Sequence, residues 1–368
     1  MSVFLAAVRD TLRTLFAERY AVVTMIGAVI LYSVFYPSAY RHQVASNLPV
    51  VVVDDDHSPL SRDLVRRVQG VRAVHLRAQV PTMDEAHRMI AAGQVEGVLW
   101  IPAGLQRDIL RGGTGHVAIQ GNGAYLSRAS TVLAGLGDAV AGFAPEAARK
   151  QAMFAGAPAH APYRLVARPL FNTREGYGSA IVPGVAELIV HQTLLIGIAV
   201  ILGGRRRDTG SRVRMGAAQL AGMGTAFFCV GLFGLFLYSG ITSWVQDYPR
   251  GGNLPGLLLV GSLFLAATVL FAMFLGSFFV SRERAFQYIT ASSLVLFFLA
   301  NLSWPITSTP PVLAWAAKLL PTTPGITAMV QLNQMGASVS ETAPQAVNLL
   351  ALVVIYAGLA MWRFRSRA

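Results

Sequence analysis

Six long apolar runs and one polar stretch set the pattern of this chain. One run lies near the N-terminus, and the other five fill the second half, at about Ile181–Leu202, Met215–Trp244, Leu254–Ser281, Phe286–Ile306 and Val347–Trp362. Crossing the hydrocarbon core of a bilayer, about 30 Å thick, takes about 20 mostly apolar helical residues. The pattern therefore predicts a polytopic α-helical membrane protein with six transmembrane helices. The first helix is at 20–38, and an inserted domain follows it.

The inserted segment, residues 39–179, alternates strand-like and helix-like patterns. Short runs rich in β-branched residues predict strands at about Pro49–Val53, Val71–Leu76, Val95–Ile101, His116–Gln120 and Leu165–Phe171. Helical patterns lie between them. One of these opens on a capping box from Thr82 to Glu85, and a longer one begins at about Tyr125. Strands that alternate with helices imply a mostly parallel sheet covered by helices, so we expect an α/β domain.

Residues 1–19, before the first run, predict an amphipathic helix on the membrane surface. Arg9, Asp10 and Arg13 fall on its polar side. The opposite stripe consists of Val3, Phe4, Ala7, Val8, Leu12, Leu15 and Phe16.

The region 180–368 holds the other five predicted spans and one segment of a different kind. Residues 310–335 are only moderately apolar and contain several prolines, namely Pro310, Pro311, Pro321 and Pro324. We expect short helices here that enter the outer leaflet without crossing it, because such backbone is tolerated where protein covers it.

The distribution of charge predicts orientation. Hydrophobic residues make up 54% of the chain and charged residues 13%, against about 25% charged in soluble domains, and the net charge is +12. Nucleic-acid binding is not indicated, because the excess arginines lie beside apolar runs, where they retain a segment on the cytoplasmic side. Both termini are then cytoplasmic and the inserted domain is extracytoplasmic. We interpret the first run as an uncleaved anchor, since no signal-peptide cleavage pattern follows it.

Sequence motifs for enzyme chemistry are weak. Neither lysine, Lys150 or Lys318, follows a glycine, so the chain lacks a phosphate-binding loop for ATP. The run Asp54–Asp56 has two interpretations: a site for a hard metal ion, or acids that cap the following helix. Ser58 and Ser61 lack the G-x-S-x-G context of a nucleophile. We expect no catalytic, cofactor or metal site in this chain.

Two groups of charged residues are candidate functional sites. Glu187 and His191 lie four residues apart inside an apolar run, where ionisable groups are costly. They predict either a mutually satisfied polar pair or a substrate or gating site. Arg205, Arg206, Arg207 and Asp208 follow the same run and, besides fixing topology, predict a surface for a partner protein.

Several segments, in order along the chain, resemble the type-2 ABC transporter permeases, in the subgroup with a large periplasmic domain after the first span. They are Val51–Arg62 (VVVDDDHSPLSR), Gly97–Gly112, Val182–Gly184, Ser281–Ala285 (SRERA), Leu302–Pro305 and Leu320–Gly336 (LPTTPGITAMVQLNQMG). The resemblance implies a dimer with a second copy or a related permease. It also implies a cytoplasmic ATPase partner that docks on the first helix, with Arg9 and Arg13, and on Arg205–Asp208. This chain departs from the family by having RRRDTG in place of a stretch richer in acids.

These observations leave two functions open. The leading one is the permease subunit of an exporter in the bacterial inner membrane, which moves an amphipathic, lipid-like or drug substrate while a partner binds ATP. A periplasmic adaptor and membrane lipid are further expected partners. The alternative is a non-transporting receptor or scaffold whose periplasmic domain binds a ligand or partner.

Overall fold

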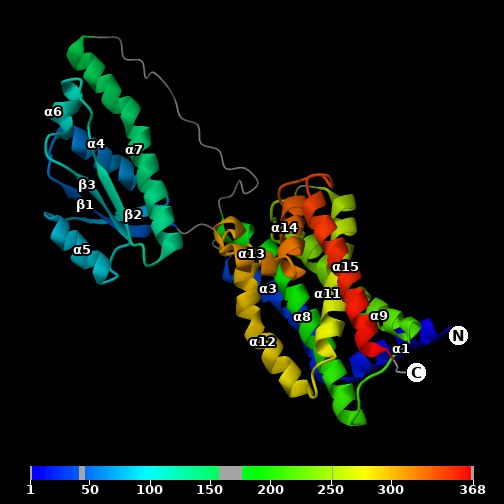
Figure 1. The fold of residues 1–368 in the computed structure, drawn as a ribbon. Helices are drawn as coiled ribbons and strands as arrows, with labels where there is room; N and C mark the ends of the chain where they lie inside the picture. Colours follow the sequence, from blue (N-terminus) through cyan, green and yellow to red (C-terminus); the bar gives the residue numbers. More distant parts are fainter. Residues whose placement is uncertain (1, 41–45, 157–175, 251, 366–368) are drawn as a thin grey trace. The chain divides into compact units, whose positions relative to one another are not determined.

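The computed structural model describes residues 2–40, 46–156, 176–250 and 252–365, and it divides into two compact units (Figure 1). Unit 1, which we call the bundle, comprises Met1–Gln43 and Pro169–Ala368. Unit 2, the α/β unit, comprises Val44–Arg168. Each unit has its own buried apolar clusters, so the two are described separately. The strand predicted at Leu165–Phe171 lies outside the described residues.

The α/β unit contains a four-stranded sheet in the order β2-β1-β3-β4. The central strand β1 (Leu48–Asp54) pairs in parallel with β2 (Val74–Gln79) and with β3 (Gly97–Ile101). The edge strand β4 (Ala118–Gly121) pairs with β3 in the antiparallel sense. The sheet is therefore mostly parallel, as the alternation of strands and helices predicts.

Helices cover both faces of this sheet (Figure 1). Successive side chains of a strand point to opposite faces. Val50 and Val52 therefore pack in one cluster with α4 (Pro59–Gln69), α6 (Leu105–Leu110) and α7 (Leu126–Ala155). Val51 and Val53 pack in another with α5 (Met83–Ala91). This two-sided burial explains why β1 is an unbroken valine run instead of an alternating one.

The acidic turn after β1 caps a helix, as one interpretation of the sequence predicts, but the helix is α6 and not α4, which follows the turn directly. The carboxylate of Asp56 accepts a hydrogen bond of 2.8 Å from the N–H of Gly104, at the N-cap of α6. α4 is capped instead by Ser58, whose hydroxyl accepts a bond of 3.0 Å from the N–H of Ser61. The Ser61 hydroxyl in turn donates to Asp54 at 2.7 Å. The two serines thus have a structural role in this turn.

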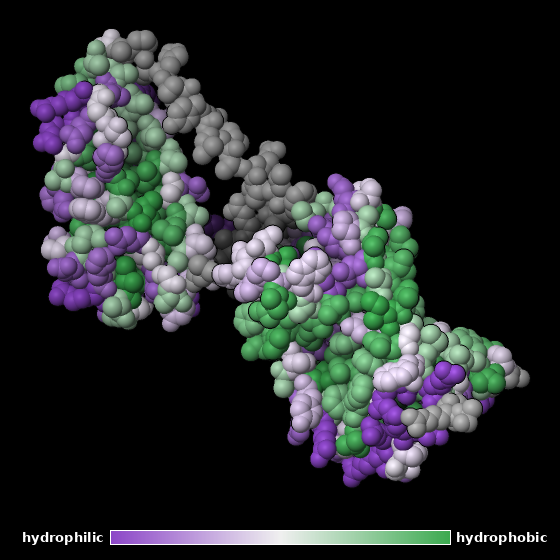
Figure 2. All heavy atoms as spheres, in the orientation of Figure 1, coloured by the Kyte–Doolittle hydropathy of each residue, from purple (hydrophilic) through white to green (hydrophobic). Residues whose placement is uncertain are grey.

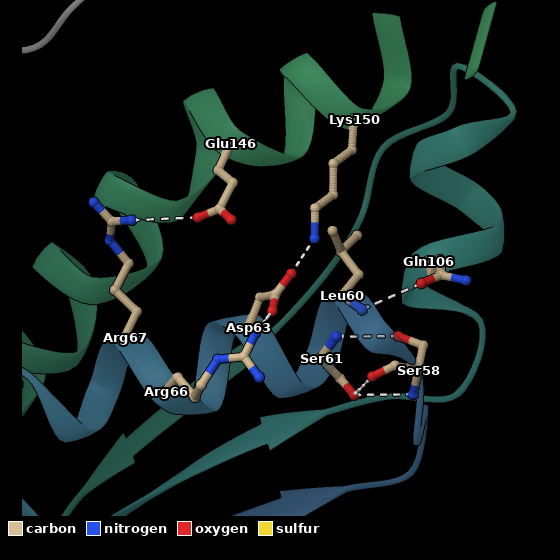
Figure 3. A network of polar contacts seen from close by, with 9 residues as sticks. All are labelled: Ser58, Leu60, Ser61, Asp63, Arg66, Arg67, Gln106, Glu146 and Lys150. Atoms are coloured by element: carbon tan, nitrogen blue, oxygen red, sulfur yellow. Dashed lines mark hydrogen bonds and ion pairs between the residues drawn. The ribbon is translucent and has the colours of Figure 1, made fainter. Parts of the chain in front are cut away.

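Ion pairs join α4 to α7 beside this core (Figure 3). Asp63 lies between two cations, Arg66 on its own helix and Lys150 on α7, and its side chain is only 12% exposed. Further along the same pair of helices, Arg67 Nη1 lies 3.5 Å from Glu146 Oε2. Because Asp63 is nearly buried, its two partners supply the charge that water would otherwise solvate.

Among the described residues of the bundle, five helical segments are long and apolar enough to cross a membrane. The first, 19–39, combines α2 (Arg19–Val22), a π-helical turn η1 (Val23–Gly27) and α3 (Ala28–Ala39). The others are α8 (Tyr177–Thr209), the segment 217–245, α11 (Leu254–Gly276) and α15 (Ala343–Phe364). The segment 217–245 combines α9 (Ala217–Leu235), the π-helix η2 (Phe236–Thr242) and α10 (Ser243–Val245). The chain is therefore a polytopic, mainly helical membrane protein.

The span predicted at Phe286–Ile306 differs most from the structure. Helix α12 covers Arg282–Leu299 and has charged side chains throughout its first turn, so it is not among the five apolar segments. It ends well before Ile306, which lies in a short 3₁₀ turn. Asn301, with φ of 61°, takes the chain out of the helix in the left-handed region. The predicted end of this span was therefore wrong.

Short helices occupy the proline-rich segment, as the sequence predicts. They are α13 (Pro311–Ala317) and α14 (Thr322–Asn333). Their depth in a membrane stays a prediction. α14 packs against α8, α11 and α15, so it is part of the bundle.

Helix α8 is the central element of the bundle. The most apolar window of α8 is 94% buried, compared with 22% for α15. Pro183 lacks an N–H and so leaves the carbonyl of Ser179 without its usual helical donor. The side chain of Gln334, at the end of α14, donates to that carbonyl at 2.6 Å. At the next residue, Gly184, a Cβ would lie 2.3 Å from Leu302, so the Pro-Gly pair sets how closely these elements pack.

Helix α1 (Val3–Ala17) packs against α9 along part of its predicted apolar stripe. Thr11 and Leu15 are buried, whereas Val3 and Phe16 are 58% and 64% exposed. A Cβ on Gly222 of α9 would lie 2.6 Å from the carbonyl of Phe4, so the two helices meet at close range. The apolar side chains that α9 leaves exposed are available to a membrane surface, and the position of α1 on such a surface stays a prediction.

Candidate functional site

Charged side chains gather where α8, α11 and α15 end and α12 begins, and we call this group the basic end. It consists of Glu18, Arg205, Arg206, Arg207, Asp208, Arg282, Glu283 and Arg363. Figure 2 shows a hydrophilic surface at this end of the bundle, next to apolar surface along the helices. The predicted run Arg205–Asp208 thus lies in one cluster with charges from distant parts of the chain.

Arg205 and Arg206 point inward and hold helices together. The Nη2 of Arg205 donates a hydrogen bond of 3.2 Å to the hydroxyl of Thr14 on α1. Arg206 donates to the carbonyls of Ser277 and Phe278, at 3.3 Å and 3.1 Å, just after α11. Carbonyls at a helix C-terminus lack intrahelical donors, and cations are favoured there. These two half-buried arginines therefore hold helices together, and their part in docking stays a prediction.

Arg207 and Asp208 lie on the surface. Arg207 Nη1 is 3.1 Å from Glu283, and Asp208 is 3.1 Å from Arg282. Both pairs have at least one well-exposed partner, so they contribute little to stability and remain accessible to a partner protein. Arg282 also reaches Glu18 at 2.9 Å, and both of these side chains are less than a third exposed.

The other predicted docking residues lie on the exposed side of α1. Arg9 is paired with Asp10 at 3.3 Å, with both side chains at least half exposed, and Arg13 is also exposed. Glu18, Arg282 and Glu283 also belong to the basic end, although the sequence had no signal for Glu18 and favoured a purely topological role for the stretch at 281–284. The SRE sequence at 281–283 was a usable signal, because an acid directly beside basic residues is not needed for topology alone.

Glu187 and His191 do not form a pair. The Oε1 of Glu187 accepts a hydrogen bond of 2.7 Å from the hydroxyl of Ser239. Its Oε2 is buried and has no hydrogen-bond partner among the described residues. His191 lies on α8 one turn away, with its ring centroid 6.3 Å from those of Phe264 and Phe271. Neither ring nitrogen of His191 has a partner in the described part of the chain, so mutual satisfaction of the two side chains is excluded.

A small cavity adjoins Glu187. Its empty volume is about 230 Å³, with room for the centre of about one water-sized group. Apolar walls come from Val182, Pro183 and Ala186 of α8, and hydroxyl groups come from the π-helical turn η2 and from α10. π-Helical turns are rare and frequently occur at functional sites. The sequence had no signal for this turn, because it depends on how 236–242 packs against α8.

The sequence is similar to those of known transport proteins. The family model described as ABC-2 family transporter protein matches residues 20–362. The inner membrane transport permease YhhJ of Escherichia coli (strain K12) is 24% identical to this chain over 375 residues, which covers 96% of the chain and 95% of the relative. The protein of the same name from Shigella flexneri matches with the same identity and coverage.

Proposed function

Because this chain belongs to the ABC-2 family of transporter proteins, and is thus a membrane transport permease, we propose that it is the permease subunit of an ATP-driven exporter in the bacterial inner membrane. It moves an amphipathic, lipid-like or drug substrate outward, and a separate subunit binds and hydrolyses ATP. The chain works as a dimer with a second copy or a related permease. In the proposed topology α12 is the fifth of six spans, both termini are cytoplasmic, and the basic end faces the ATPase.

The observation that supports this assignment best is the position of the exposed pair Arg207 and Asp208. These residues end α8, the most deeply buried of the candidate spans. A rigid helix transmits a displacement along its length, and interlocked side chains deform little. A partner that binds Arg207, Asp208 and the neighbouring face of α1 therefore acts directly on α8, and through α8 on the cavity at Glu187.

The α/β unit lies outside the membrane in this proposal. It has a compact core of its own and many charged surface residues. It receives the substrate or contacts a periplasmic adaptor.

The test is to look for a gene for an ABC-type ATPase beside the gene for this chain, and then to reconstitute the chain with that ATPase. The chain and the ATPase are co-expressed, purified through a tag on the chain, and placed in proteoliposomes. We expect the ATPase to co-purify and its ATP hydrolysis to rise above that of the ATPase alone. A tagged chain that captures no ATPase, and on which ATP hydrolysis does not depend, would contradict the proposal.

A further inference from the structure

The cavity at Glu187 is a polar site inside the bundle, and the carboxylate is the one charged group among the described residues of its lining. Its polar lining consists of Glu187, Tyr238, Ser239, Thr242, Ser243, Tyr248 and Asn333, and it includes neither lysine nor arginine. Glu187 is 3% exposed, and its Oε2 lacks a hydrogen-bond partner among the described residues. A buried carboxylate without a partner is costly, so this oxygen marks a place where a further group fits.

Three of the hydroxyl protons around this carboxylate are already in use. Tyr238 donates to the carbonyl of Val29 at 3.0 Å, Ser239 donates to Glu187 at 2.7 Å, and Ser243 donates to the carbonyl of Tyr238 at 2.9 Å. A hydroxyl has one proton and two lone pairs, so these groups can only accept further hydrogen bonds. Thr242, Tyr248 and Asn333 keep donors of their own, but the only full charge in the described lining is the carboxylate of Glu187, which suits a cation with N–H donors and disfavours an anion.

The size of the cavity and its apolar wall further limit the kinds of molecule that can bind there. The space admits the centre of about one water-sized group, and an ammonium group has that size. Val182, Pro183 and Ala186 give the same cavity an apolar side. A small charged head beside an apolar wall is the complement of an amphipathic amine.

We propose that Glu187 binds the protonated amine of the transported molecule, so that this permease selects amphipathic substrates with an ammonium head group. The inference rests on the proposed export function only in identifying the bound molecule as the transported substrate. The recognition itself depends only on the bundle. Glu187 Oε2 accepts one N–H of the ammonium group, and neighbouring hydroxyl oxygens accept the others.

The experiment uses a matched pair of fluorescent probes, dansylcadaverine, which has a primary ammonium group, and its neutral N-acetyl derivative. Binding is measured on the full chain in nanodiscs of uncharged lipid. We expect the wild type to bind the ammonium probe at least about tenfold more tightly than the acetylated one, as for a charge-assisted hydrogen bond away from water. Glu187→Gln should reduce this preference to less than about twofold, and Glu187→Asp, which keeps the charge, should retain much of it.

Glu341→Gln serves as the control variant, since that carboxylate is exposed and accepts from Ser338 outside the cavity. Equal affinities of the wild type for the two probes would overturn the inference, and this measurement needs no variant to fold. So would a preference that Glu187→Gln leaves unchanged, or displacement of the probe by sodium chloride but not by choline chloride, which would indicate an inorganic cation site. Loss of ATP-driven transport of both probes, with the binding preference intact, would instead count against the export function alone.

Discussion

The two units of this protein differ in whether a buried carboxylate has a cation beside it, although Glu96 and Glu187 each keep one oxygen without a hydrogen-bond partner among the described residues. In the α/β unit, Asp63 has two cationic partners, and Glu96, 8% exposed, accepts a hydrogen bond of 2.8 Å from Arg128. In the bundle, Glu187 is more deeply buried and has only the neutral hydroxyl of Ser239. A paired carboxylate is explained by the fold around it. An unpaired one weakens the fold, and its presence points to a function that the isolated chain does not complete.

The two ends of α8 also differ in whether their charged groups have partners. At the basic end, Arg282 is held by Glu18 and Asp208, and Arg206 is held by backbone carbonyls. Near the other end, the cavity at Glu187 keeps one oxygen unused. We expect this arrangement in a helix that transmits a displacement from a partner protein to a substrate. One end of the helix is held by ion pairs and hydrogen bonds, and the cavity near the other end has an acceptor free for the substrate. The following predictions test this contrast, starting with the largest expected effect.

The largest expected effect concerns the orientation of the chain in the membrane, because each loop is either labelled from outside or not. Single cysteines replace Ser211, at the basic end, and Arg250, in the predicted outer loop, on a Cys229→Ser background. Both positions are exposed. An impermeant thiol reagent should label intact cells only at position 250, because arginine-rich loops stay on the cytoplasmic side. Labelling of both positions from outside would reverse the proposed roles of the two ends.

Removal of the paired carboxylate should destabilise the α/β unit strongly. The fragment 45–172 should fold alone, with a cooperative thermal transition, because this unit has its own core. Asp63→Ala leaves Lys150 and Arg66 without their shared partner, and it should lower the free energy of unfolding by about 2–4 kcal/mol. The control is Asp138→Ala, an exposed position on α7. Equal effects of the two substitutions, or a fragment without a transition, would show that the pair does not stabilise this unit.

Loss of the central cation at the basic end should have a moderate effect. Arg282→Ala removes the contacts to Glu18 and Asp208, of which the less exposed one, to Glu18, ties α12 to the start of the first span. We expect a decrease of about 1–3 kcal/mol in stability, seen as a lower unfolding temperature of the purified full chain. Arg284→Ala, an exposed neighbour, is the control. An unchanged transition in Arg282→Ala would mean that this end is held by apolar packing alone.

The smallest effect on stability is expected from the exposed pair, together with a clear effect on assembly. The double variant Arg207→Glu, Asp208→Arg should leave the unfolding temperature nearly unchanged, because exposed ion pairs stabilise little. Its co-purification with the ATPase should fall at least about tenfold, because reversed charges oppose the partner surface. Arg250→Glu is the matched control on the predicted opposite side. A double variant that retains full ATPase binding would confine these residues to a topological role.

Much of the architecture was predictable from the sequence because its signals are local. An apolar run of about 20 residues predicts a span wherever it occurs. The alternation after the first run predicts strands and helices because a strand and a helix repeat with different periods. The valine run of β1 and the threonine cap of α5 are examples, since each depends only on its neighbours in the chain.

The roles of the charged residues were decided by tertiary structure. Arg205, Arg206 and Arg207 are consecutive, yet two face inward and one faces outward, because successive residues of a helix point about 100° apart. Glu187 and His191 share a helix face by spacing, but Ser239 and Phe264 lie beside different parts of that face. Whether a charge binds a partner, fastens a helix or awaits a ligand depends on which distant segments pack around it. That information is set by the three-dimensional arrangement of helices and is absent from any local pattern.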